Sequence, residues 1–67
     1  MKMTFVRIEK GFDGPGYSAV FSCEDTVGGK PTVWEIKYGK RDVLNLLPHP
    51  HLGPVMRQAI DAFPEDA

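Results

Sequence analysis

The sequence predicts an α+β fold, a two-layer sandwich of a sheet and helices. Its parts are a three-stranded antiparallel β-meander, followed by one short and one longer α-helix packed on one face of the sheet. Segments of alternating apolar and polar residues continue as far as Tyr38, and helical spacing replaces them after Gly39. A chain of 67 residues with no internal linker has the size of one domain, so we expect a single domain over residues 1–67.

The first strand is predicted at residues 2–9, where β-branched and aromatic residues are frequent. Strict alternation would place Met3 and Phe5 on one face and Val6 and Ile8 on the other. This strand would then show apolar side chains to both faces of the sheet. The pattern leaves open whether the strand lies at the edge of the sheet or in its centre, and a dimer contact would cover its second apolar face.

Two more strands are predicted at residues 17–24 and 32–38, because apolar and polar residues alternate in both. Between them, the dipeptide Gly28-Gly29 suits the positive φ angles of a hairpin turn. Pro31 stands where the third strand would begin rather than inside it. Short links join neighbouring strands, so the second strand should lie in the middle of an antiparallel meander.

Two helices are predicted at residues 42–47 and 54–63. Asp42 is a suitable N-cap for the first, and a proline directly after Leu47 prevents its continuation. Pro54 suits the first turn of the second helix, whose apolar residues recur at helical spacing. The predicted core forms where the sheet residues Tyr17, Phe21, Trp34, Ile36 and Tyr38 meet the helical residues Leu44, Leu47, Met56, Ile60 and Phe63.

Composition and charge exclude several classes of function. The 8 basic and 9 acidic residues give a net charge of −1 and form no block of one sign, which makes nucleic acid an unlikely partner. No apolar stretch is long enough for a membrane span, and the N-terminal residues do not resemble a secretory signal. A single cysteine, Cys23, is typical of a reducing compartment. We therefore expect a cytoplasmic protein without a membrane segment.

The segment LLPHPHLGP, residues 46–54, raises the question of a metal or catalytic site, because His49 and His51 stand among three prolines. Two histidines are fewer ligands than protein metal sites use, and no further ligand stands at a recognisable spacing. A pairing of Cys23 with a histidine is disfavoured, since Cys23 belongs to the inward face of its strand. We expect no metal, no cofactor and no catalytic residue. Whether the histidines do more than link two helices stays open.

The glycine-rich segment GFDGPG, residues 11–16, is predicted to be a turn. It lacks the Lys-Ser/Thr pair of a phosphate-binding loop and leads into a strand, whereas such loops lead into helices. We expect no phosphate site there.

The face of the sheet that points away from the helices is the first candidate for binding a partner. Adjacent valines on a flat sheet would form an apolar patch of the kind that marks protein interfaces. The other interpretation is a small cluster covered by lysine and glutamate side chains. Open strand edges and exposed acidic groups are further candidates. The candidate partner-binding residues are Val6, Ile8, Val20, Val33, Glu24, Asp25 and Asp61.

The segment WEIKYGKR is the strongest candidate for contact with nucleic acid. Lys37, Lys40 and Arg41 stand near Trp34 and Tyr38, a mixture that single-strand binders use. The aromatic residues are assigned to the core, and acidic residues are interleaved with the basic ones. A solvated end of the sheet is therefore the favoured interpretation, and a small nucleic-acid-associated protein is the alternative.

The function predicted from these observations is non-enzymatic binding to another protein. A domain this small has a limited core, so a partner or a second copy in a homodimer is a source of further stability. Small cofactor-free domains of this kind are typical of proteins by which phages and mobile elements inhibit host machinery, anti-CRISPR proteins among them. The partner and the source are not encoded in any motif of the sequence.

Overall fold

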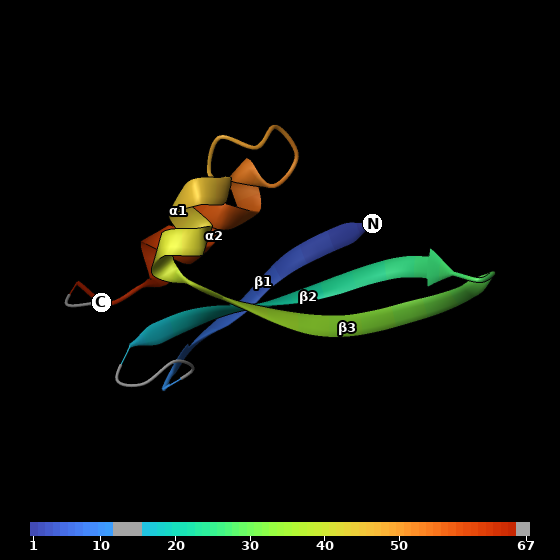
Figure 1. The fold of residues 1–67 in the computed structure, drawn as a ribbon, viewed down its shortest axis with the longest axis horizontal. Coiled ribbons are helices and arrows are strands. Elements are labelled where there is room, and N and C mark those ends of the chain that lie inside the picture. The colour runs from blue at the N-terminus through green and yellow to red at the C-terminus, as the bar shows by residue number, and fades with distance from the viewer. Residues whose placement is uncertain (12–15, 66–67) are drawn as a thin grey trace.

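The computed structural model describes residues 1–11 and 16–65, so residues 12–15 of the predicted turn lie outside the described residues. The structure confirms the predicted α+β class, with an antiparallel sheet in the order β1-β2-β3 followed by two helices (Figure 1). The elements are β1 (Lys2–Lys10), β2 (Tyr17–Val27), β3 (Lys30–Gly39), α1 (Lys40–Leu46) and α2 (Gly53–Ala62).

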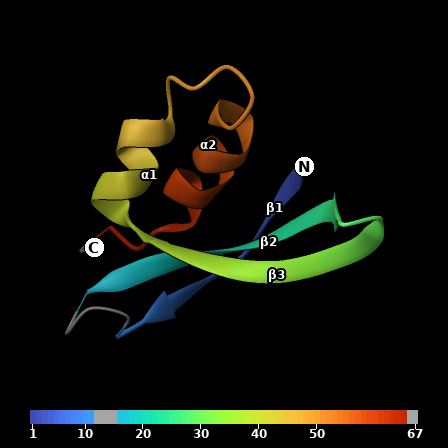
Figure 2. The same ribbon diagram turned by 45° about the vertical axis from the view of Figure 1, so that its right-hand side comes forward.

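Both helices lie on the same face of the sheet, as predicted (Figures 1 and 2). α2 packs over β1, and α1 packs over β2 and β3. The opposite side of the sheet, which we call the outer face, carries no helix in the described part of the chain. The helices cover only one end of the sheet, and the far end of the β2–β3 hairpin extends past them (Figure 1).

The β2–β3 hairpin is longer than predicted. β2 continues to Val27 and β3 begins at Lys30, and these two residues pair directly. Gly28 and Gly29 form the turn between them with φ of 58° and 79°, which confirms the predicted hairpin turn. Pro31 lies near the start of β3, at the edge of the sheet, where a missing N–H group is tolerated.

The helices begin earlier than predicted. α1 starts at Lys40, directly after β3, and its N-cap is Gly39 with extended backbone and no side-chain cap. The prediction that Asp42 is the N-cap is therefore wrong, because Asp42 lies inside the first turn. In α2, Pro54 lies in the first turn as predicted, and the helix ends before the extended residue Phe63.

Phe21 occupies the centre of the core. The centroid of its ring lies 5.9 Å from that of Phe5 and 5.8 Å from that of Tyr38. The fully buried apolar residues of the core cluster are Ala19, Phe21, Val43, Met56 and Ala59. Most of the predicted core residues belong to this cluster or pack against it, namely Tyr17, Phe21, Ile36, Tyr38, Leu47, Met56, Ile60 and Phe63.

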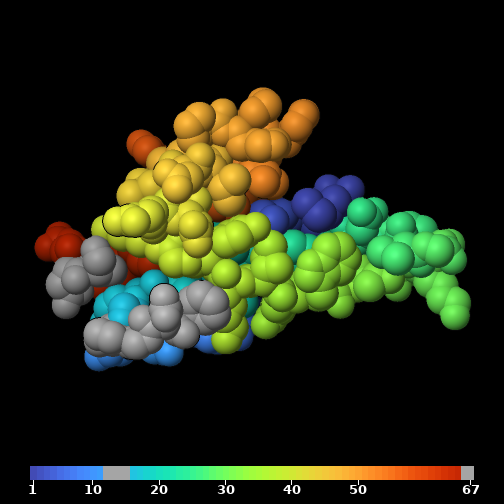
Figure 3. All heavy atoms as spheres, in the orientation of Figure 1, coloured from blue at the N-terminus to red at the C-terminus, as the bar shows by residue number. Residues whose placement is uncertain are grey.

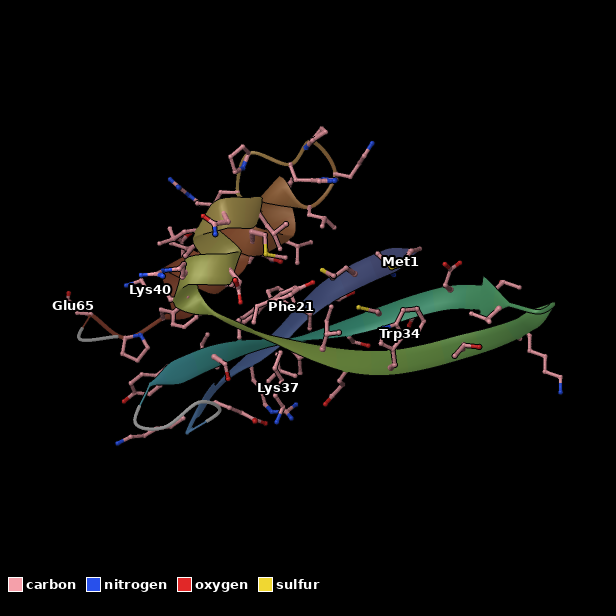
Figure 4. All side chains as sticks on the ribbon, viewed as in Figure 1. Met1, Phe21, Trp34, Lys37, Lys40 and Glu65 are labelled. Atoms are coloured by element: carbon pink, nitrogen blue, oxygen red, sulfur yellow. The ribbon has the colours of Figure 1, made fainter. Side chains whose placement is uncertain are left out.

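Two residues predicted for the core lie outside it. Trp34 points to the helical side of the sheet, as its pairing with Cys23 requires. It remains 36% exposed because it stands where the helices no longer cover β3 (Figure 4). Leu44 is 47% exposed, and its neighbour Val43 is the residue of α1 that is buried. A helix this short with several consecutive apolar residues does not reveal its buried side by periodicity.

β1 contains a β-bulge that the sequence pattern did not reveal. Phe5 pairs with Phe21, whereas Arg7 pairs with Val20, the residue directly before Phe21. Val6 is therefore an extra residue in β1 and has no opposite residue of its own.

The bulge reverses the side to which the following residues of β1 point. Ile8 pairs with Ala19 and packs against the core, while Arg7 and Glu9 point to the outer face. The expectation that Val6 and Ile8 share a face is wrong, because alternation changes phase at a bulge. β1 is an edge strand, and this change of phase accounts for its apparent two-sided apolar pattern without a covering partner.

Candidate protein-binding surface

The far end of the β2–β3 hairpin, residues 24–33, forms a projecting ribbon that we call the hairpin arm. Lys2, the first residue of β1, pairs with Glu24, so beyond that point β2 and β3 pair only with each other. From Asp25 to Thr32 no strand of the described residues pairs with either outer edge of the arm, although the N-terminal amine of Met1 lies 3.8 Å from Asp25 Oδ1. No helix lies above this part of the hairpin (Figures 1 and 2). A ribbon of only two strands has little stability by itself, and contact with another surface would add to it.

Exposed apolar side chains lie on both faces of the arm and beside it. Val27 is 58% exposed and Val33 is 64% exposed, and Trp34 follows directly at its base. The space-filling view shows this end of the molecule standing clear of the helices (Figure 3). Isolated apolar residues are common on surfaces, but exposed apolar residues on both faces of an unsupported projection favour a partner that encloses it.

A shallow, open hollow runs along the arm. Its lining combines apolar and charged residues: Met1, Lys2, Glu24, Asp25, Thr26, Pro31, Thr32 and Val33. Three of the predicted partner-binding residues, Glu24, Asp25 and Val33, thus line one surface. Another predicted partner-binding residue, Asp61, is exposed on α2 in the helical layer and does not belong to this lining. Val27, which is exposed on the arm outside this lining, was not predicted from the sequence as a partner-binding residue.

The outer face does not carry the apolar patch considered above. Val20 is fully buried there, between its cross-strand partners Arg7 and Lys37. Val6 is exposed at the bulge, and Ile8 points to the helices. The structure thus scatters these residues over different surroundings, and only Val33 stands as an exposed valine on the outer face of β3.

Ion pairs cover Val20. The carboxylate of Glu9 accepts hydrogen bonds from both neighbouring cations. Its Oε1 lies 2.9 Å from Lys37 Nζ, and its Oε2 lies 2.6 Å from Arg7 Nη2. Arg7 Nη1 lies 3.6 Å from Glu35 Oε2. These contacts join β1 to β3 across β2, and Figure 4 shows Lys37 extending from the outer face. The charged cover corresponds to the second interpretation of this face given by the sequence.

The ion pairs also set the ionisation of Glu9. Hydrogen bonds from Lys37 and then from Arg7 hold the pKa of Glu9 below its ordinary value. A carboxyl group whose pKa is lowered by folding stabilises the fold at neutral pH, above its unfolded pKa. That contribution is lost as the pH falls through the lowered pKa of the folded state. The pairs are partly exposed, so salt screens them.

The basic residues of the alternative hypothesis are divided between two layers. Lys37 is paired with Glu9 on the outer face. Lys40 opens α1, with its Nζ 6.0 Å from the centroid of the Phe63 ring, and Arg41 is exposed on the same helix. Figure 4 shows Lys37 and Lys40 extending from different parts of the fold. The fold does not align these three side chains along one strand or one helix face.

The ring of His49 has a structural role in the segment between the helices, where it accepts backbone hydrogen bonds. Its Nδ1 accepts the backbone N–H groups of His51 and Leu52, both at 3.1 Å. The backbone N–H of Gly53 donates to the carbonyl oxygen of His49 at 2.8 Å, at the start of α2. The His49 ring therefore closes the turn that leads into α2, and its Nδ1 must be unprotonated to do so.

Replacing His49 with alanine is expected to lower the free energy of unfolding by about 1 kcal/mol, because two backbone N–H groups lose their acceptor. Urea denaturation followed by circular dichroism measures this loss. His51→Ala is the matched control, since His51 joins these hydrogen bonds through its backbone N–H and its ring only lies beside that of His49, with 5.9 Å between the centroids. Equal losses in the two variants would contradict the structural task of the His49 ring.

Cys23 is a buried residue of β2, whereas His49 and His51 are exposed in the segment between the helices. Cys23 is buried, and burial raises the pKa of its thiol, which keeps it in the neutral, weakly nucleophilic form. Among residues 1–11 and 16–65, no three His, Cys, Asp or Glu side chains gather as a metal site. Within the same residues, neither helix has the length and apolar character needed to cross a membrane.

Comparison with known proteins finds no match to this chain among family models, curated proteins or solved structures.

Proposed function

We propose that this protein is a non-enzymatic protein-binding domain that docks through its hairpin arm. The observation that carries the proposal is the arm itself, a two-stranded ribbon that extends past the helices with Val27 and Val33 exposed. Glu24 and Asp25 are exposed beside these valines. The complementary partner surface is an apolar cleft with basic groups at its rim.

Inhibition of host machinery by a phage or mobile-element protein, as anti-CRISPR proteins do, is a specific form of this proposed function. An inhibitor of this kind needs a stable surface that occupies a site on a larger protein, and it needs no cofactor. The projecting arm is suited to such blocking because it can enter a cleft that a flat surface cannot reach.

The test is affinity capture with a matched pair of variants. The double variant Val27→Lys and Val33→Lys changes the arm, and Leu44→Lys changes another exposed apolar residue, on α1. We expect a protein from a bacterial lysate to be retained by the wild type and by Leu44→Lys but to be lost from the arm variant. Purified, that protein should bind the wild type with a dissociation constant at least about tenfold lower than the arm variant.

The outcomes separate the arm from the other candidate surfaces. Equal retention by the arm variant, or no protein whose capture depends on the arm, would contradict the proposal. Bound material that disappears after nuclease treatment would favour the basic residues Lys37, Lys40 and Arg41 in its place. Circular dichroism of each variant confirms that the fold is kept.

A further inference from the structure

The free edge of β3 is a regular strand edge with nothing paired to it in the described part of the chain. β3 pairs only with β2, and the sheet order leaves its other side open. Pro31 has no N–H group, and a sheet tolerates it where that group would point away from the neighbouring strand. Glu35 and Lys37 follow at even spacing from Pro31, so their N–H and C=O groups point to the same open edge.

The other edge of the sheet is less suited to pairing. It belongs to β1, which is interrupted by the bulge at Val6. A bulge twists an edge strand and breaks the regular spacing of its hydrogen-bonding groups, and natural sheets use bulges to prevent edge-to-edge pairing. β3 has no such interruption in its pairing with β2 from Lys30 to Gly39. The two edges therefore differ in their capacity to accept another strand.

The sequence of β3 is complementary to itself when two copies run antiparallel about Ile36. In that register Glu35 of one copy stands opposite Lys37 of the other, and the twofold axis repeats the pair. Trp34 stands opposite Tyr38 in the same way, on the helical side of the sheet. Opposite charges and paired aromatic rings are the cross-strand combinations that stabilise antiparallel strands.

We propose that a second copy of this chain pairs with the β3 edge in this register, so that two three-stranded sheets become one of six strands. The Glu35–Lys37 pairs supply hydrogen bonds between the backbones as well as ion pairs between the side chains. The pairing covers Trp34, which the helices of its own chain leave 36% exposed. A twofold axis through the sheet places both pairs of helices on one side and the two arms at opposite ends.

A second copy would also add stability that the small core of one chain does not supply. A domain of 67 residues buries a modest apolar area, and joining two such sheets adds buried surface and backbone hydrogen bonds. The proposal rests on residues 34–38 and is independent of the partner proposed for the arm. If both hold, the dimer presents two arms, and a partner with two sites would bind it more tightly than one arm alone.

Charge exchange at the two central positions tests the proposal. Glu35→Lys places lysine opposite Lys37, and Lys37→Glu places glutamate opposite Glu35, so each variant alone brings like charges together twice. We expect each to weaken self-association by about tenfold or more in sedimentation equilibrium, relative to the wild type. Mixing the two variants restores both attractive pairs, and we expect a dimer of one copy of each with an affinity near that of the wild type.

The control separates the dimer contact from the ion pairs within one chain. Glu9→Gln removes the partner of Lys37 on β1 without changing the edge of β3, and it is expected to leave self-association unchanged. A wild type that stays monomeric up to the highest soluble concentration would overturn the proposal. A mixture of Glu35→Lys and Lys37→Glu that associates no better than either variant alone would overturn the register about Ile36.

Discussion

Replacing Val20 with lysine is expected to unfold most of the protein, whereas the same replacement at Val33 is expected to be tolerated. Both valines point to the outer face of the sheet, but Val20 is fully buried and Val33 is 64% exposed. Lysine at position 20 would stand between Arg7 and Lys37, beneath the ion pairs that close over this position. An unpaired buried charge costs more than about 2 kcal/mol, a large part of the stability of a small domain.

Thermal and urea denaturation of the two variants, followed by circular dichroism, measures this difference. Val33→Lys should stay within about 0.5 kcal/mol of the wild type, as exposed substitutions usually do. If Val20→Lys were as stable as the wild type, the ion pairs would not close over this position. The outer face would then again be a candidate for an apolar contact.

Replacing Phe21 with alanine is expected to have the largest effect on stability of any single substitution in the core. The ring is fully buried at the centre of β2, between Phe5 and Tyr38. Its removal costs about 3–5 kcal/mol, which equals the whole stability of about 3–5 kcal/mol that a single core of this size supplies. We therefore expect Phe21→Ala to show the far-ultraviolet spectrum of an unfolded chain at room temperature.

Trp34→Ala is the matched comparison for this prediction. It removes a larger side chain from the same side of the sheet, one strand away, but Trp34 lies outside the core cluster. At low protein concentration it should keep the fold and lose less stability than Phe21→Ala. A greater loss from Trp34→Ala would mean that the core is centred further along the hairpin than the structure places it.

The candidate binding surface was predictable in part. Glu24, Asp25 and Val33 are among the residues that the sequence singled out, and the structure brings them to one hollow on the arm. Val27 and the length of the arm were missed, because the polar run before Val27 interrupts the apolar alternation. The turn could have predicted the longer hairpin, because a two-residue turn at Gly28-Gly29 requires the residues on either side of it to pair.

The task of His49 could not be predicted from spacing. The prolines around it correctly indicated a joint between two helices. The hydrogen bonds from two backbone N–H groups to its Nδ1 depend on the path that the chain takes through that joint. The sequence does not distinguish a histidine that accepts backbone hydrogen bonds from a histidine that binds a metal. The positions of the neighbouring groups in the structure distinguish them.

The sequence by itself determined the class and order of the elements in this protein. Alternation up to Tyr38, the positive φ angles that Gly28-Gly29 permits and the proline in the first turn of α2 all act between near neighbours in the chain. Only the tertiary structure decided the burial of Val20 and the side of the sheet to which Ile8 points. Val20 is covered by Glu9 and Lys37 together with their ion partners, and the bulge in β1 turns Ile8 to the core. Burial depends on residues that are distant in sequence, and no local pattern encodes where they meet.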